Sequence, residues 1–140
     1  MGWREERDRA VAARAAALAR QQAAEAQQAR RLIAGFVTRA HALGLPAGPL
    51  RCTSYDGRAR YRTALRGWYL NPARTIAVDV DGDYYSLLVP RGLSARLHGA
   101  RPRPQAPRLI VGEGSRDGES IPLRDLLAKR LRELASEDEP

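Results

Sequence analysis

Residues 68–89 decide the fold, and they read WYLNPARTIAVDVDGDYYSLLV. Two β-rich runs, residues 75–80 and 83–89, flank the dipeptide Asp81-Gly82. Such a dipeptide between two β-rich runs favours a hairpin, because its residues accept the positive φ angles of a tight turn. The stretch therefore predicts an antiparallel meander, and Gly67 just before it indicates a bulge or the close approach of another backbone.

A two-residue loop at Asp81-Gly82 fixes the register of this hairpin. Val78 would then lie opposite Tyr85, and Ile76 opposite Leu87. Side chains alternate along a strand, so one face of the hairpin would carry six core residues: Ile76, Val78, Val80, Tyr85, Leu87 and Val89. The other face is too apolar for full exposure, and we expect something to cover it, since it carries Thr75, Ala77, Tyr84, Leu88, Trp68 and Leu70.

Helices are predicted on both sides of the strands. Residues 4–43 contain neither proline nor a turn cluster, so they predict one long helix that ends at Gly44 and Pro46. A second helix over residues 123–135 has one apolar face of leucines. The predicted fold is α+β, with a long N-terminal helix, an antiparallel sheet of three to five strands and a C-terminal amphipathic helix. Whether both helices cover the same face of the sheet is left open.

The long helix divides into two parts. Its second half has a wide apolar stripe that packs onto a core: Leu32, Ile33, Phe36, Val37, Ala40 and Leu43. Its first half carries only a narrow seam, which predicts helix pairing at Val11, Ala15, Leu18, Ala26 and Ala29. This seam fits two interpretations. The first is a coiled coil with a partner, which could be a second copy of the chain, and the second is a helical arm that is simply solvated. We therefore divide the chain into a helical arm (1–31), a single α+β domain (32–136) and an acidic tail (137–140), which is expected to be disordered.

Composition narrows the class of protein. The chain has 140 residues, the size of one domain, with a net charge of +8 that comes almost wholly from arginine. The preference for arginine and alanine is typical of a GC-rich bacterial genome. Cys52 is the only cysteine, which excludes an intramolecular disulfide and a cysteine zinc site. Because no apolar run approaches a signal core or a membrane span, we expect a soluble, cytoplasmic protein.

No catalytic, cofactor-binding or metal-binding motif is complete. Asp79, Asp81 and Asp83 resemble the start of a calcium loop, but the sixth and twelfth positions are Tyr84 and Pro90 instead of Gly and Glu. Residues 112–118 lack the spacing of a phosphate-binding loop. We therefore expect no catalytic residues, no cofactor and no metal, and a protein that is not an enzyme.

Positive charge gathers in two segments, residues 51–66 and 91–108. The first mixes arginines with aromatic rings, a combination that holds phosphates and stacks on bases. The second contains Arg101-Pro102-Arg103-Pro104, an extended basic ribbon. The residues predicted to bind a protein partner or nucleic acid are Arg58, Arg60, Arg62, Arg66, Arg101, Arg103, Tyr55, Tyr61 and Trp68.

Three functions fit these observations. The first is a non-catalytic interaction protein, an adaptor or assembly factor that uses the alanine-rich arm and the arginine-rich surface to dock an acidic protein. The second is a small nucleic-acid-binding protein that uses the same arginines and aromatic rings. The third is an enzyme with a pocket on an uncovered face of the sheet near Trp68.

Overall fold

The structure, a computed structural model, describes residues 2–112 and 120–137. A long N-terminal helix, a five-stranded sheet and a C-terminal helix confirm the predicted α+β class. In chain order the elements are α1 (Trp3–Ala42), β1 (Gly48–Ser54), β2 (Arg60–Tyr69), β3 (Ile76–Asp79), β4 (Tyr84–Ser86), β5 (Leu88–Val89), α2 (Leu93–His98), β6 (Ile110–Val111), β7 (Ile121–Pro122) and α3 (Leu123–Glu137).

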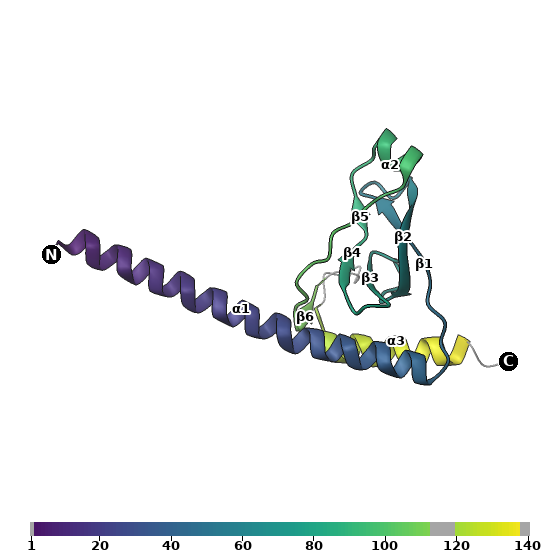
Figure 1. Cartoon of the computed structure of the whole chain (residues 1–140), viewed down its shortest axis with the longest axis horizontal. Coiled ribbons are helices and arrows are strands. Elements are labelled where there is room, and N and C mark those ends of the chain that lie inside the picture. Colours follow the sequence, from purple (N-terminus) through teal and green to yellow (C-terminus); the bar gives the residue numbers. More distant parts are fainter. Residues whose placement is uncertain (1, 113–119, 138–140) are drawn as a thin grey trace.

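Helix α1 has 40 residues and is therefore about 60 Å long. Its first half projects away from the rest of the chain (Figure 1), and every residue from Gly2 to Ala24 is exposed. The helix ends as predicted: Gly44 has a φ angle of 69°, and the Leu45 N–H donates to the Ala40 carbonyl at 2.9 Å. This arrangement is a glycine C-cap, and Leu45 is buried beneath it.

The five-stranded sheet has the order β4-β3-β2-β1-β5. Only Leu87 separates β4 from β5, so a single chain segment forms both edges of the sheet. The Leu87 N–H donates to the Thr75 carbonyl at 2.7 Å, and the Leu87 carbonyl accepts from the Thr53 N–H at 2.8 Å. The sheet therefore closes on itself into a small barrel.

The sheet is mixed, so our prediction of an entirely antiparallel sheet is wrong. Strand β5 pairs with β1 in parallel, with Thr53 opposite Leu88. The other pairs, β1–β2, β2–β3 and β3–β4, are antiparallel. The sequence of residues 68–89 does not indicate the parallel β1–β5 pairing. That pairing depends on β1, which precedes the meander in the chain.

The predicted hairpin register is wrong by one residue. Ala77 lies opposite Tyr85, because residues 80–83 form a longer loop than the two-residue turn. The cause is the Asp79 carboxylate, whose Oδ1 accepts the N–H groups of Asp81 at 3.0 Å and Asp83 at 2.9 Å. This loop needs a positive φ angle only at Gly82, where it is 85°.

The register shift divides the predicted core face between two cores. Ile76 and Val78 face the helices, Tyr85 and Leu87 face the barrel interior, and Val80 is exposed. The barrel interior is filled by a cluster of seven buried residues: Leu50, Cys52, Tyr61, Ala77, Tyr85, Leu87 and Ala100. A larger core lies between the barrel wall and the two helices, with Trp68 and Leu70 from the wall and Ile33 and Leu127 from the helices at its centre.

Both terminal helices lie on the same side of the barrel, where α1 and α3 pack against each other (Figure 1). Trp68 and Leu70 are thereby covered. They lie on the same face of the sheet as Ile76 and Val78, so our assignment of these two residues to the opposite face, with Ala77, is wrong. Strands β6 and β7 form a short hairpin that leads into α3. No helix in residues 2–112 and 120–137 is long and apolar enough to span a bilayer. In the predicted acidic tail, Glu137 is the last residue of α3, and the other three residues lie outside the described ranges, as do residues 113–118 of the glycine-rich loop.

Candidate anion-binding site

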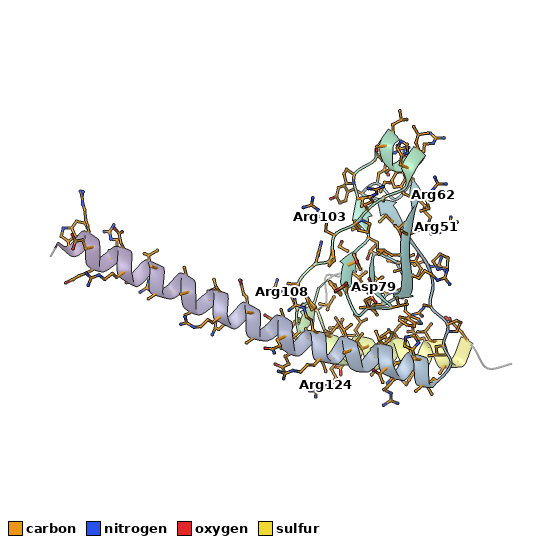
Figure 2. All side chains as sticks on the ribbon, viewed as in Figure 1. Arg51, Arg62, Asp79, Arg103, Arg108 and Arg124 are labelled. Atoms are coloured by element: carbon orange, nitrogen blue, oxygen red, sulfur yellow. The ribbon has the colours of Figure 1, made fainter. Side chains whose placement is uncertain are left out.

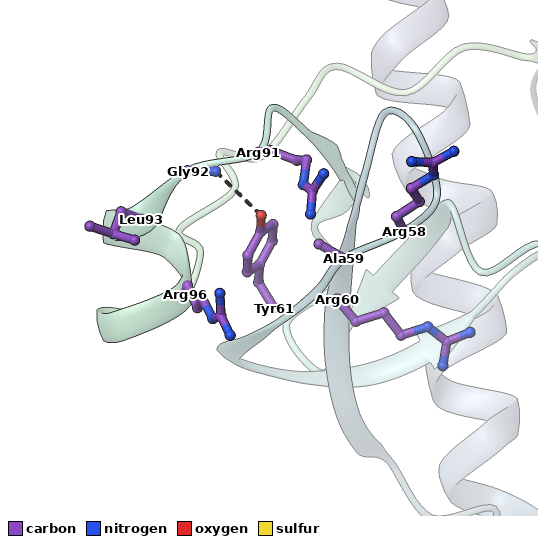
Figure 3. Close-up of a pocket in the computed structure, with 8 residues that line it drawn as sticks. All are labelled: Arg58, Ala59, Arg60, Tyr61, Arg91, Gly92, Leu93 and Arg96. Carbon is purple, nitrogen blue, oxygen red and sulfur yellow. Dashed lines mark hydrogen bonds between the residues drawn. The ribbon is translucent and has the colours of Figure 1, made fainter.

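A pocket of about 560 Å³ lies at the end of the barrel that is farthest from α1, next to α2 (Figures 1 and 3). Three segments enclose it: the turn between β1 and β2, the start of β2, and the chain from the end of β5 into α2. We call it the arginine pocket. Its lining residues are Arg58, Ala59, Arg60, Tyr61, Arg91, Gly92, Leu93 and Arg96.

The turn between β1 and β2 is held by its own side chains. The buried Ser54 hydroxyl donates to Asp56 Oδ1 at 2.5 Å and accepts the Ala59 N–H at 3.0 Å. The Arg58 N–H donates to the same Asp56 oxygen at 3.0 Å. Gly57 takes a φ angle of 74°, which lets the chain reverse. The turn therefore presents the Arg58 side chain from a fixed backbone.

The opposite wall is joined to this turn by an ion pair. Arg91 Nη1 lies 3.3 Å from Asp56 Oδ2. Hydrogen bonds from the Ser54 hydroxyl and the Arg58 N–H, with the positive charge of Arg91, lower the pKa of Asp56 below its ordinary value. On the inner side the Gly92 N–H donates to the Tyr61 hydroxyl at 3.3 Å (Figure 3). Tyr61 is buried and closes this end of the barrel interior.

The pocket carries a surplus of positive charge. Among the described residues, Arg58, Arg60 and Arg96 form no ion pair, and Arg91 shares its charge with Asp56 alone. Guanidinium groups bind carboxylates and phosphates in a two-pronged geometry, and they keep their charge at any physiological pH. The arrangement can therefore hold an anion, and the pocket has room for a side chain or a phosphate group.

The structure brings together three of the predicted binding residues, Arg58, Arg60 and Tyr61. Tyr55 projects from the same turn and is 70% exposed, although it does not line the pocket. Arg101 and Arg103 lie on the exposed chain that follows α2, outside the arginine pocket.

Arg62 and Arg66 also lie outside the pocket, and each binds a backbone carbonyl. Arg62 Nη2 donates to the Leu97 carbonyl at 3.1 Å and so fastens α2 to β2. Arg66 Nη2 donates to the Ala47 carbonyl at 2.9 Å near the opposite end of the barrel. Both side chains therefore have a structural partner within the chain.

Trp68 cannot stack on a base in this fold, in contrast to our prediction. It is only 3% exposed, and its ring meets Phe36 and His41 edge to face at centroid distances of 5.9 and 5.5 Å. The sheet face that the enzyme hypothesis requires to be open is packed beneath α1 and α3. Trp68 is buried where the sheet meets the helices, so it cannot reach a base and the sheet face around it is closed.

Sequence reasoning did not assign Arg91 and Arg96, which complete the pocket. They belong to segment 91–108, which contains no acidic residue, and this excess of positive charge was the one feature of the sequence that could have indicated them. Their position follows from the parallel pairing of β5 with β1, in which the Tyr55 N–H donates to the Val89 carbonyl at 3.1 Å. This pairing places Arg91 beside the turn that carries Arg58.

The predicted helix-pairing residues fall into two groups. Val11, Ala15 and Leu18 are exposed on the projecting half of α1, where Val11 is 57% and Leu18 54% exposed. Ala26 and Ala29 are buried within the chain's own fold. The seam that remains open to a partner is therefore the part before residue 25.

A scan against protein-family models found no match to this chain, and searches of curated proteins and of solved structures found no significant match either.

Proposed function

We propose that the protein is a non-catalytic interaction protein, an adaptor or assembly factor. Its α1 arm pairs with another helix, and its arginine pocket docks an acidic segment of a partner protein. The observation that carries the proposal is the projection of α1, in which residues 2–24 lie outside the domain while the second half of the same helix is anchored in the core.

The arm has the properties of a helix that lacks its partner. Most helices of globular proteins gain their stability from packing an apolar face, and isolated helices are only marginally stable in water. Val11 and Leu18 are exposed on one side, and the alanines between them let a second backbone approach closely. Pairing would bury these residues and hold the arm in its helical form.

The arginine pocket supplies a second contact of different chemistry. Carboxylates of a partner would bind to Arg58, Arg60 and Arg96, which form no ion pair among the described residues. The projecting half of α1 and the pocket beside α2 lie far apart (Figure 1), so two partners could bind without competing for one surface. This separation supports the role of an adaptor.

Point variants of the full chain test the proposal. Leu18→Glu places a charge on the pairing seam, whereas Ala13→Glu places the same charge on the opposite side of α1. We expect Leu18→Glu, and not Ala13→Glu, to lose the helix partner in a quantitative pull-down, or to convert a dimer into a monomer in light scattering if the partner is a second copy. Equal behaviour of the two variants would contradict the role of the arm.

The pocket is tested in the same pull-down with Arg58→Glu combined with Arg60→Glu. We expect this variant to lose an acidic partner and to keep the helix partner, because the two surfaces are far apart. Reversal of the same number of charges outside the pocket, by Arg101→Glu combined with Arg103→Glu, should leave both interactions in place. If this control variant loses the acidic partner equally, the pocket is not its binding site.

Nucleic acid is a second candidate partner, favoured by one observation. Tyr55 is 70% exposed in the turn that also presents Arg58, so one turn carries both an exposed aromatic ring and a guanidinium group. This candidate predicts binding to single-stranded DNA or RNA that weakens steeply as salt rises. Fluorescence anisotropy at two salt concentrations decides it, since an absence of binding at low salt eliminates nucleic acid.

A further inference from the structure

A second surface, separate from the arm and the arginine pocket, lies between α1 and α3. The two helices run side by side in the same direction (Figure 1), and an open groove of about 490 Å³ lies between them. Arg124, on its rim, points away from the barrel (Figure 2). The groove is lined by Arg31, Leu32, Gly35, Phe36, Arg39, Arg124, Leu127, Ala128, Leu131 and Arg132.

The floor of the groove is apolar. Phe36 and Leu127 form its deepest part and are almost fully buried, while Leu32 and Leu131 are partly exposed above them. Gly35 leaves a gap in the wall, since a Cβ atom added there would meet no atom within 4 Å. Glycine costs up to about 1 kcal/mol relative to alanine within a helix, and no neighbour in the described structure requires it here.

The rim of the groove is cationic. Each helix contributes two arginines eight positions apart, Arg31 and Arg39 from α1 and Arg124 and Arg132 from α3, which corresponds to about 12 Å along each axis. None of the four forms an ion pair within residues 2–112 and 120–137. The neighbouring Arg130 shows the contrast, because it turns inward, binds the Tyr69 carbonyl at 2.6 Å and pairs with Glu133.

We propose that this groove docks an acidic amphipathic helix of a partner protein. An apolar stripe at helical spacing would lie on Phe36, Leu127 and Leu131, and glutamates or aspartates beside that stripe would meet the four arginines of the rim. Repulsion excludes a basic helix of the same shape, so the rim selects the charge of the partner while the floor selects its amphipathic form.

Charge also argues against a second copy's α1 arm as the occupant. Residues 2–24 carry five arginines and three acidic residues, so the arm is itself positive. The rim would therefore repel it. The inference does not depend on the proposed roles of the projecting half of α1 or of the arginine pocket, because the groove shares no residue with residues 2–24 or with the pocket.

The test uses two designed peptides and the full chain. One fluorescent peptide is a 20-residue amphipathic helix with leucines at i, i+3, i+4 and i+7 spacing and glutamates along both sides, and its control replaces every glutamate with lysine. We expect the wild-type protein to bind the acidic peptide in fluorescence anisotropy, more weakly as salt rises, and to leave the lysine peptide unbound.

Two variants alter the groove by different means, one by changing its shape and the other by changing its charge. Gly35→Trp fills it from an open position, and Arg124→Glu combined with Arg132→Glu reverses half of the rim. Each should weaken the binding of the acidic peptide at least about tenfold, a change that corresponds to a loss of about 1.4 kcal/mol. Gly35→Ala and the combination of Arg14→Glu with Arg20→Glu serve as controls, because the first leaves most of the groove open and the second reverses the same number of charges on the arm. Both controls should bind as the wild type does.

Three results would overturn the inference. They are no binding of the acidic peptide at low salt, equal binding by the wild type and both groove variants, and a wild-type dimer in light scattering that Gly35→Trp converts to a monomer. The last result would show that a second copy of this chain, and not a foreign acidic helix, occupies the groove.

Discussion

Replacing Gly67 with alanine tests how the barrel is built. Gly67 lies in β2 opposite Asp79 of β3, and a Cβ atom added to it would lie 2.0 Å from the Val78 carbonyl oxygen and 2.6 Å from the Asp79 Cα. Ordinary C···O contacts between strands are about 3.3 Å or longer. Both obstructing atoms belong to the backbone, so no side-chain rotation can relieve the contact, and β2 and β3 must separate by about 1 Å or more.

The expected cost follows from the pairing that this separation disrupts. Strands β2 and β3 pair at three positions, Gly67 with Asp79, Trp68 with Val78 and Tyr69 with Ala77. Weakening three ladder positions at about 1 kcal/mol each gives about 3 kcal/mol. This figure agrees with the upper end of the strain found for overpacked cores, about 1–3 kcal/mol. For a domain of this size the loss lowers Tm by about 10 °C.

Urea and thermal unfolding followed by circular dichroism measure this loss. The matched control is Gly48→Ala, because Gly48 lies opposite Gly67 in the β1–β2 pair and has no atom within 4 Å of an added Cβ. We expect Gly48→Ala to stay within about 1 kcal/mol of the wild type. If Gly67→Ala also stays within that range, the close approach of β2 and β3 is wrong.

Three further predictions concern the β3–β4 loop and the barrel interior. Asp79→Ala should lower the free energy of unfolding, measured in urea, by about 3 kcal/mol. The reason is that the buried Asp79 carboxylate accepts hydrogen bonds from Asp81, Asp83 and Tyr85. A loss below about 1 kcal/mol would contradict this role. Burial and the nearby Asp79 raise the pKa of Tyr85 to about 12, above its ordinary value of about 10 in an unfolded chain. This tyrosine therefore contributes stability that is complete below about pH 10 and is lost as the pH rises toward 12. Tyr85→Phe should remove that part of the pH dependence in urea titrations, and an identical fall in both proteins would refute the assignment. Burial raises the pKa of the Cys52 thiol, so a thiol reagent should label it rapidly only in denaturant, whereas rapid labelling of the native protein would show that the interior is open.

Local sequence patterns were sufficient for the helices. The predicted stripe on α1 faces the core except for Leu43, which is 51% exposed, and the leucines of α3 face the core as predicted. Helical spacing alone fixes one face of each helix. Gly44 ends α1 for an equally local reason, the positive φ angle of its C-cap. The close approach that Gly67 indicated is confirmed by the Val78 carbonyl next to it.

The sheet was harder to predict because its register depends on one side chain. The dipeptide Asp81-Gly82 favours a two-residue turn, but Asp79 offers its carboxylate to the loop N–H groups and lengthens the loop. A shift of one residue moves every following side chain to the other face, which is why Ile76 and Leu87 belong to different cores.

The candidate site was predicted only in part for a similar reason. Arg58 and Arg60 lie in one short stretch of sequence, so a cluster of charge was visible there. Arg91 and Arg96 join them through the parallel pairing of β5 with β1, a long-range contact that has no local signature. The burial of Trp68 beneath the helices likewise depends on where α1 and α3 pack.

The most direct test of the proposed interaction role is photo-crosslinking from the α1 arm in living cells of the source organism. A photoreactive phenylalanine analogue would replace Leu18 on the pairing seam or Arg20 on the opposite side, and the crosslinked peptides would be identified by mass spectrometry. Our account predicts crosslinks from position 18 to a helix of another polypeptide, either a second copy or a different protein, and few from position 20. Equal crosslinking from both positions, or none from either, would contradict the claim that the arm is a helix-pairing surface.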